Sequence, residues 1–263
     1  MIGIFDSGIG GLTVVKALRQ RLSGHDLIYF GDTACAPYGN KSSAVILHNV
    51  MNGLEILRNR GARIIIIACH TSSAAVYDRI EPRFDVPVFE VVSPAVKLSL
   101  QLTTCGRLGI IGTRATIASG LYPRKIGELN PAAKVYSVAC PMLIPLAEEG
   151  WLKQPIVSMI VKKYVHSLKI RQIDTLILGC NYFPLFRRII QTKIGRRVHL
   201  IDPSLATADS LVQYLQENAA ISDRLTRNQS LRVMVSDLTD QIEKSARMIL
   251  KQKIRLEHIS RDP

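Results

Sequence analysis

The sequence predicts an α/β fold with two pseudo-symmetric, doubly wound halves built on parallel-type sheets, and three observations lead to this prediction. Short apolar runs typical of strands alternate with amphipathic stretches typical of helices along most of the 263 residues. Several runs are apolar throughout, which is typical of parallel strands covered on both faces. The opening "IGIFDSGIGG" resembles "LGIIGTRATIASG" at 108–120, because in both a strand leads into small and hydroxyl residues before a helix.

The first half is expected to contain four strands with helices between them. A stripe of Leu and Val side chains predicts a helix directly after the first strand. A second helix, over 43–60, is expected to end before Gly61, because glycine suits a helix C-terminus. The expected strands are residues 1–5, 26–32, 64–69 and 86–92.

The second half repeats this alternation and is followed by a C-terminal segment. After Asp202 we expect a helix to about Glu217, a strand at 231–236 and a last helix with a basic tail. The strands expected in the second half are residues 107–113, 134–140, 175–180 and 197–202. The helices expected between them lie near 115–129, 155–168 and 185–193.

The composition indicates a globular protein without a membrane segment. With 47% hydrophobic residues, the chain can bury one large core or two smaller ones. The longest apolar runs are too short to cross a bilayer, and the first residues do not resemble a secretory leader. We therefore expect a cytoplasmic protein that does not associate with membranes.

Cysteine usage and charge exclude several classes of function. The five cysteines form no CxxC pair and no Cys/His cluster of zinc spacing, so we expect free thiols and no metal. The net charge of +13 can attract nucleic acid, but the basic residues are scattered and have no aromatic side chains among them. A nucleic-acid partner is therefore not expected. A nucleotide cofactor is not expected either, because Thr13 stands where a G-x-G-x-x-G loop needs its last glycine.

Two cysteines stand where apolar strands end. Cys69 follows "IIIIA" and Cys180 follows "TLILG". Ligands of open α/β sheets bind beyond the carboxyl ends of strands, so we expect each half to contribute one thiol to a common cleft. Thr71, Ser72 and Ser73 are good helix N-cap residues, so we expect the positive end of a helix to favour the thiolate of Cys69.

The second cysteine has a similar context. Asn181 is a candidate cap for the next helix, and Pro184 suits its first turn. Two such thiols can act on one carbon from opposite sides, one removing a proton and the other returning one, without any cofactor. A cysteine hydrolase would instead need a histidine partner and an oxyanion hole around one cysteine.

Other polar residues suit a small charged ligand. Asp6 can hold an ammonium group and Ser7 a carboxylate, although both are also suited to capping the next helix. The tripeptide "PYG" can place the Tyr38 phenol and the Gly39 amide at the cleft, although it is also a common turn sequence.

Seven segments, in the same order along the chain, closely resemble the glutamate racemases, the cofactor-independent enzymes that supply D-glutamate for bacterial peptidoglycan and cell-wall biogenesis. The likeness runs from Ile2 to about Asp202 and extends more weakly through "VMVSD". The segments are "GIFDSGIGGLTV", "YFGDTACAPYG", "IIIACHTSSA", "VSPAV", "LGIIGTRATI", "PLAEEG" and "LGCNYFPL".

The resemblance implies a two-domain isomerase with the active site in the cleft between the domains. The first domain would contain residues 1–92 and 207–263, and the second residues 93–206. The resemblance also implies glutamate as the substrate, a homodimer and no cofactor. The implied catalytic residues are Cys69, Cys180, Asp6, Asp32 and Glu148. The implied substrate-binding residues are Asp6, Ser7, Tyr38, Gly39, His70, Thr71, Asn181 and Tyr182.

The chain departs from the family pattern beside both cysteines. His70 stands where the family usually has Asn, and Asn181, Tyr182 and Phe183 replace the usual Thr-His-Tyr. Tyrosine, with a pKa of about 10, is a poor proton acceptor at neutral pH. The departures leave three alternatives open: a racemase of another acidic amino acid such as aspartate, a slow or asymmetric glutamate racemase, and an inactive homologue that acts as a binding protein.

Overall fold

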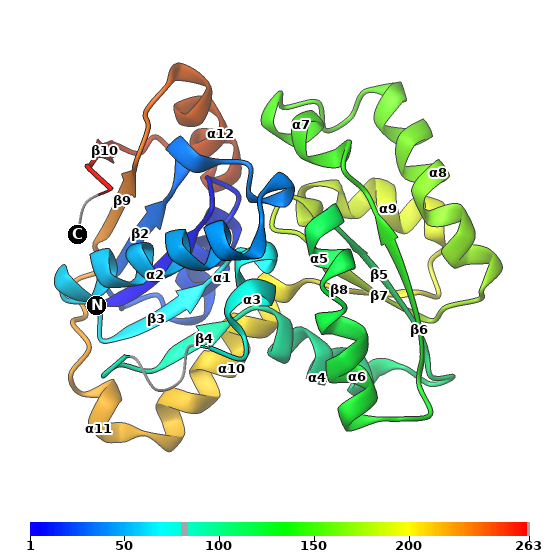
Figure 1. The fold of residues 1–263 in the computed structure, drawn as a ribbon, viewed down its shortest axis with the longest axis horizontal. Helices are drawn as coiled ribbons and strands as arrows, with labels where there is room; N and C mark the ends of the chain where they lie inside the picture. Colours follow the sequence, from blue (N-terminus) through cyan, green and yellow to red (C-terminus); the bar gives the residue numbers. More distant parts are fainter. Residues whose placement is uncertain (80–83, 262–263) are drawn as a thin grey trace.

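Two sheets with only parallel pairings form the framework of the protein (Figure 1). The structure is a computed structural model that describes residues 1–79 and 84–261. The first sheet has the strand order β10-β9-β2-β1-β3-β4, and the second has the order β6-β5-β7-β8. The predicted parallel α/β fold is therefore confirmed.

The first sheet takes its strands from both ends of the chain, and the second takes them from the middle. The strands of the first sheet are β1 (Ile2–Asp6), β2 (Leu27–Gly31), β3 (Ile64–Ile67), β4 (Val88–Glu90), β9 (Leu231–Val235) and β10 (Leu256–His258). The strands of the second sheet are β5 (Arg107–Gly112), β6 (Lys134–Ala139), β7 (Thr175–Gly179) and β8 (His199–Ile201).

The predicted helices are present, with additional short ones between them. The α-helices of the first 150 residues are α1 (Leu12–Arg21), α2 (Ser43–Asn59), α3 (His70–Val76), α4 (Val92–Leu102), α5 (Arg114–Ala118), α6 (Leu121–Leu129) and α7 (Leu143–Glu148). The later ones are α8 (Pro155–Ile170), α9 (Arg187–Ile194), α10 (Pro203–Glu217), α11 (Ala219–Ser222) and α12 (Asp240–Leu250). Three 3₁₀ helices are η1 (Thr33–Cys35), η2 (Tyr38–Asn40) and η3 (Phe183–Phe186).

Burial explains why the central strands are apolar throughout. Every residue of β1, β2, β3 and β7 is buried. In the first sheet, one set of alternating side chains packs in a cluster with α2, and the other packs in a cluster with α1, α10 and α12. The second cluster continues into the second sheet through Leu176 and Leu178, so one apolar core joins the two sheets.

The structure corrects several predicted elements. The helix expected over 115–129 is divided into α5 and α6 at Gly120, which has a φ of 65°. The helix expected over 185–193 begins as η3, and α9 starts only at Arg187. The helices α4 and α7 and the strand β10 were not predicted. Pro94 in α4 and Pro145 in α7 weaken the helical pattern of the sequence there. The strand β10 has only three residues and lies in a basic tail.

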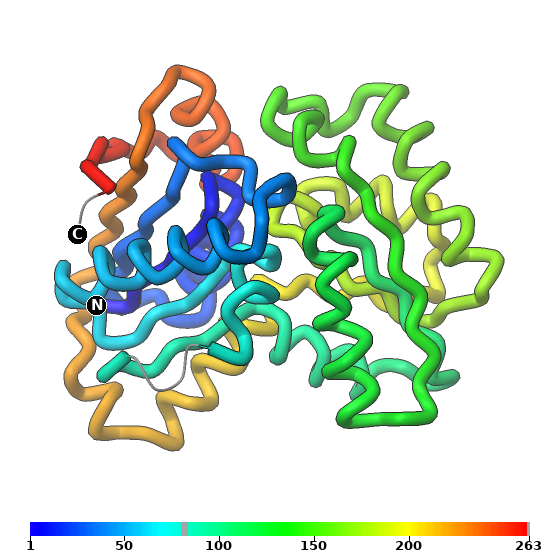
Figure 2. Tube along the Cα trace, viewed as in Figure 1, coloured from blue at the N-terminus to red at the C-terminus, as the bar shows by residue number. Residues whose placement is uncertain are grey.

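The division of the strands follows the predicted two halves, whereas the exact domain boundaries stay a prediction. The boundary after residue 92 lies in the first turn of α4, and the boundary after residue 206 lies inside α10. Figure 2 shows that both segments pass between the two halves. Within the described residues, no helix combines the length and apolar character needed to span a membrane.

Candidate active site

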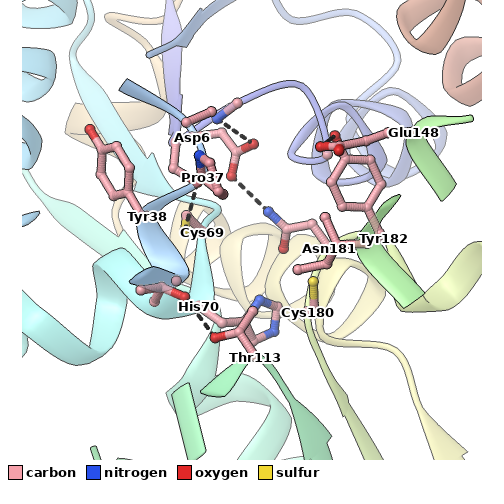
Figure 3. Close-up of a pocket in the computed structure, with 17 residues that line it drawn as sticks. Asp6, Pro37, Tyr38, Cys69, His70, Thr113, Glu148, Cys180, Asn181 and Tyr182 are labelled. Atoms are coloured by element: carbon pink, nitrogen blue, oxygen red, sulfur yellow. Dashed lines mark hydrogen bonds between the residues drawn. The ribbon is translucent and has the colours of Figure 1, made fainter. Parts of the chain in front are cut away.

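A cavity lies where the carboxyl ends of strands from both sheets face each other (Figure 3). Its volume is about 70 Å³. Residues that follow β1, β3, β5 and β7 line it, as expected for open α/β sheets. Both strand-end cysteines are among them: Cys69 from the first sheet and Cys180 from the second.

Cys69 is held at the junction of β3 and α3. It is itself the N-cap of α3, because its Sγ accepts the amide hydrogen of Ser72 at 3.4 Å. This corrects the prediction that Thr71, Ser72 or Ser73 would cap the helix. The hydroxyl of Ser7 donates a second hydrogen bond to the same Sγ at 3.2 Å. Two donors on one sulfur favour the thiolate form.

Burial of the Cys69 thiol has the opposite effect, because it disfavours the charged thiolate. Burial and the nearby Asp6 carboxyl raise the pKa of the Cys69 thiol above its ordinary value, although the hydrogen bonds from Ser7 and Ser72 reduce the shift. The predicted preference for thiolate is therefore wrong for the ligand-free cavity. Burial also raises the pKa of Cys180, and a hydrogen bond from the main-chain amide of Tyr182 opposes this rise.

Cys180 follows β7, and the turn after it differs from the prediction. The N-cap position of η3 is Tyr182, without a side-chain cap, and Pro184 lies in the first turn as expected. Asn181 was the candidate for this cap. Instead, its side chain crosses the cavity, and its Nδ2 donates to Oδ1 of Asp6 at 2.8 Å.

Asp6 lies at the end of β1 and is held by donors from both halves. Besides Asn181, the amides of Gly8 (3.2 Å) and Gly11 (2.9 Å) and the Tyr29 hydroxyl (3.2 Å) donate to its Oδ2. A Cβ at position 11 would lie only 2.7 Å from the Cβ of Asp6, so glycine is needed there for this turn to close. Burial raises the pKa of Asp6 despite these donors.

Glu148 and Tyr182 form a pair at another wall of the cavity. The Tyr182 hydroxyl donates to Oε1 of Glu148 at 3.2 Å. Burial raises the pKa of Glu148, and the bond from Tyr182 opposes this shift. Burial and the nearby Glu148 raise the pKa of Tyr182 well above its ordinary value, so its phenol is a hydrogen-bond donor and not a base.

Asp32 is the one predicted catalytic residue that does not line the cavity. Its carboxylate lies behind Tyr38, whose hydroxyl donates to Oδ2 at 2.6 Å. Ser236 donates to Oδ1 at 2.8 Å, and Arg261 lies 3.1 Å from the same oxygen. This geometry suits Asp32 to holding the Tyr38 ring, because both of its carboxylate oxygens already have partners.

The other predicted residues line the cavity, together with several that were not predicted. The hydroxyls of Thr71, Thr113 and Thr116 form a cluster with separations of 2.9–3.2 Å. Thr113 follows β5 as Ser7 follows β1, so the internal repeat in the sequence could have identified Thr113 as a site residue. The predicted residues at the cavity are Asp6, Ser7, Tyr38, Gly39, Cys69, His70, Thr71, Glu148, Cys180, Asn181 and Tyr182. The lining residues not predicted are Gly8, Gly10, Ala36, Pro37, Thr113 and Ile144.

His70 does not carry the charge that a surface histidine can carry. It is the first residue of α3 and only 3% exposed. Burial lowers the pKa of its imidazole to about 3, so the ring is neutral at physiological pH. The ring lies 6.3 Å, centroid to centroid, from the ring of Tyr122.

Comparisons with known proteins agree with the geometry. The profile of the Asp/Glu/hydantoin racemase family matches residues 11–211. A glutamate racemase of Aquifex pyrophilus is 39% identical over 249 residues, which cover 95% of this chain and 93% of the relative.

Solved structures show the same relationship. The glutamate racemase of Francisella tularensis, solved with D-glutamate, has a TM-score of 0.91 and 37% identity, covering 99% of this chain and 97% of its own. The RacE1 glutamate racemase of Bacillus anthracis has a TM-score of 0.92 and 30% identity over the same shares. An aspartate racemase of Picrophilus torridus has a TM-score of 0.58 and 17% identity, covering 84% of this chain and 98% of its own, which shows the fold alone.

Proposed function

Because this chain belongs to the glutamate racemases of the Asp/Glu/hydantoin racemase family, we infer that it interconverts L- and D-glutamate. Glutamate racemases supply D-glutamate for bacterial peptidoglycan. The observation that carries the assignment to this site is the position of two thiols, one from each sheet, on one small cavity. The weaker likeness to aspartate racemases does not favour the aspartate alternative.

The two thiols would divide the reaction between them. The thiolate of one cysteine removes the Cα proton, and the thiol of the other donates its proton to the opposite face of the carbon. Each turnover therefore leaves the two sulfurs with exchanged protonation states and the amino acid inverted. The raised pKa values of both thiols mean that ionisation must be favoured by the incoming substrate, whose ammonium group is positive.

The remaining side chains would bind the substrate. Asp6 is the anionic group best placed to face an ammonium, because it lines the cavity and is fixed by four donors. Ser7 is placed to favour the thiolate of Cys69. Tyr38 and Thr71 contribute to the wall, and Glu148 faces the cavity through its bond with Tyr182.

Circular dichroism of the purified protein with L-glutamate, and separately with D-glutamate, tests this function. Both signals are expected to decay to zero, and Cys69→Ala and Cys180→Ala are expected to prevent the decay from either enantiomer. Binding of glutamate without loss of the optical signal would support an inactive binding protein and contradict the racemase.

We also propose how the protein assembles and where in the cell it acts. We expect a homodimer, and the exposed side chains of Met142, Trp151, Ile156 and Met159 on and beside α7 and α8 are suited to an interface. Light scattering after gel filtration tests this, and a monomer at micromolar concentration would contradict it. We place the enzyme in the cytoplasm, where two unpaired cavity cysteines stay reduced.

A further inference from the structure

The cavity has no permanent positive charge, although its proposed substrate has two carboxylates. Among its described lining residues there is no Lys or Arg, whereas Asp6 and Glu148 are acidic. A glutamate with both carboxylates ionised carries a net charge of −1. Bringing a second anion into a buried site that already holds acids is costly unless a positive charge is supplied. Of the described lining residues, His70 alone has a side chain that can become a cation.

Three buried atoms of the lining residues His70 and Asn181 have unused hydrogen-bonding capacity. Within the described structure, neither Nδ1 nor Nε2 of His70 has a hydrogen-bond partner, and neither has Oδ1 of Asn181. Both side chains are more than nine-tenths buried, at 3% and 6% exposure. Buried polar groups without partners are uncommon, and because these two side chains line the cavity they can receive a group that is supplied from outside.

The orientation of Asn181 determines what that group is. Its Nδ2 is committed to Asp6, so its Oδ1 is left as an acceptor (Figure 3). The Asn181 side chain faces His70 and opposes the effect of burial on the pKa of that imidazole. An imidazolium donates from both nitrogens. One N–H then has Asn181 Oδ1 as its acceptor, and the other requires an anionic acceptor from the ligand.

We propose that His70 receives one carboxylate of the bound amino acid and takes up a proton from solvent as the ligand enters. This rests on the proposed function and deepens it, since it assigns a charge-balancing role to a residue that the family usually replaces with a neutral amide. No covalent bond changes within the ligand: the proton moves from water or buffer to the imidazole, and the ligand carboxylate accepts its hydrogen bond.

Other titratable groups surround the imidazole and have to be separated from it in a test. Cys69 precedes it as the N-cap of α3, Cys180 follows β7 on the same cavity, and the Tyr122 ring lies beside it from α6. Asp6 is connected to it through Asn181, and Glu148, Tyr182 and Tyr38 line the same cavity. Each thiol can also exchange a proton when substrate binds, so the measurement is made with and without them.

Isothermal titration with racemic glutamate measures the proton uptake directly. Enantiomers have equal enthalpy, so turnover adds no heat and the signal reports binding alone. Titrations at pH 7 in phosphate and in Tris, which differ in ionisation enthalpy, are expected to give different binding enthalpies, corresponding to uptake of up to one proton per site. The difference is expected to persist when both cysteines are alanine, and to disappear in His70→Asn and His70→Gln, each checked for folding by its far-UV spectrum.

The pH dependence provides a second readout. Because the complex holds one more proton than its separate components, raising the pH weakens binding, by up to about tenfold in KM per pH unit. In His70→Asn the KM is expected to change less with pH. The nitrogen chemical shifts of one histidine, identified by its loss in the variant, are expected to move to imidazolium values on adding racemic glutamate.

Two results would overturn the inference while leaving the proposed function intact. One is racemisation with a binding enthalpy that does not depend on buffer. The other is a buffer dependence that is unchanged in both His70 variants, which would place the proton on another group. Absence of racemisation in the same samples would instead contradict the proposed function.

Discussion

The two cavity cysteines differ in their nearest donors, although their places in the fold are similar. Cys69 Sγ accepts hydrogen bonds from the Ser7 hydroxyl and the Ser72 amide, whereas the Tyr182 amide is the group that favours the thiolate of Cys180. The first sulfur is therefore the easier one to ionise. The strand-end positions of the two cysteines made them candidates in the sequence, but this inequality depends on Ser7, which is 62 residues distant from Cys69 in the sequence.

Replacing Ser7 with alanine is expected to move the pH profile of racemisation. The hydroxyl donor favours the thiolate, so its loss raises the pKa of Cys69. The acid limb of kcat/KM should then move to higher pH, and below that limb the rate should fall roughly tenfold for each pH unit by which the limb moves. Ser73→Ala is the matched control, because its hydroxyl donates to the main-chain carbonyl of Cys69 and not to sulfur. An acid limb that stays in place in Ser7→Ala would contradict the assignment.

Replacing Tyr182 with histidine is expected to accelerate racemisation by at least about tenfold, because a buried imidazole can accept a proton that this phenol cannot. The equilibrium constant between enantiomers is 1, so kcat/KM must rise equally in both directions and asymmetry can appear only in kcat. Deuterium incorporation at Cα from each enantiomer measures it.

Tyr182→Phe is the control for that change. It removes the bond to Glu148 but keeps the ring against Gly10, and we expect a change of only a few fold. If the parent already turns over both enantiomers rapidly and Tyr182→His is slower, this account of the tyrosine is wrong.

At the scale of elements, strand-to-helix junctions decide where the functional groups lie. Each sheet is covered by helices on both faces, and the chain leaves each central strand at the same edge, where a side chain can reach the cavity. The rigidity of this arrangement depends on close contacts between the covering helices and the strands. Gly53 in α2 shows this, because a Cβ there would lie 2.2 Å from Cε2 of Phe5 on β1.

Gly53→Ala is expected to destabilise the protein by about 1–2 kcal/mol. Overpacking a buried site costs about 1–3 kcal/mol, which exceeds the gain of up to about 1 kcal/mol from replacing a helical glycine. Gly127→Ala in α6 is the matched control. Among the described residues beyond its own helical turn, no atom lies within 4 Å of the place that a Cβ would take there, so the same change should stabilise the protein. The expected gain is about 0.5–1 kcal/mol. Urea unfolding measures both, and equal effects of the two changes would contradict this explanation.

At the scale of the whole molecule, the two halves are joined by more than two chain crossings. The apolar cluster that includes Ile4 and Val15 also contains Leu178 and Ile190 of the second half. Asn181 bonds to Asp6 across the cavity, and the side chains of Gln241 and Ser245 on α12 donate to the main-chain carbonyl of Glu148. Because these contacts hold the two halves together, they also fix the positions of the residues that line the cavity.

A shared core of this kind predicts one cooperative unfolding transition. Scanning calorimetry is expected to give equal calorimetric and van't Hoff enthalpies, because neither half can lose its core alone. Racemic glutamate at about 100 times its Kd should stabilise the whole protein by about 2.7 kcal/mol and raise the single midpoint. Two separate transitions, with glutamate shifting only one, would show that the halves unfold independently.

Much of the fold could be predicted because its signals are local. An apolar run such as 64–67 predicts a buried strand, and alternation with helices predicts parallel pairing. The missed elements had weak local signals: α7 contains a proline in six residues, and β10 is a three-residue strand whose pairing with β9 is not visible in the sequence. The break at Gly120 depends on a left-handed conformation that glycine permits but does not require.

The sequence by itself determined the alternation of strands and helices, the two strand-end cysteines and the family, because each follows from neighbouring residues or from motifs in order. Only the tertiary structure decided that Asp32 lies behind Tyr38, that Asn181 bonds to Asp6 and does not cap a helix, and that the His70 ring is neutral. The physical reason is that burial and hydrogen-bond partners set the charge and direction of a polar side chain, and most of those partners are distant in the chain.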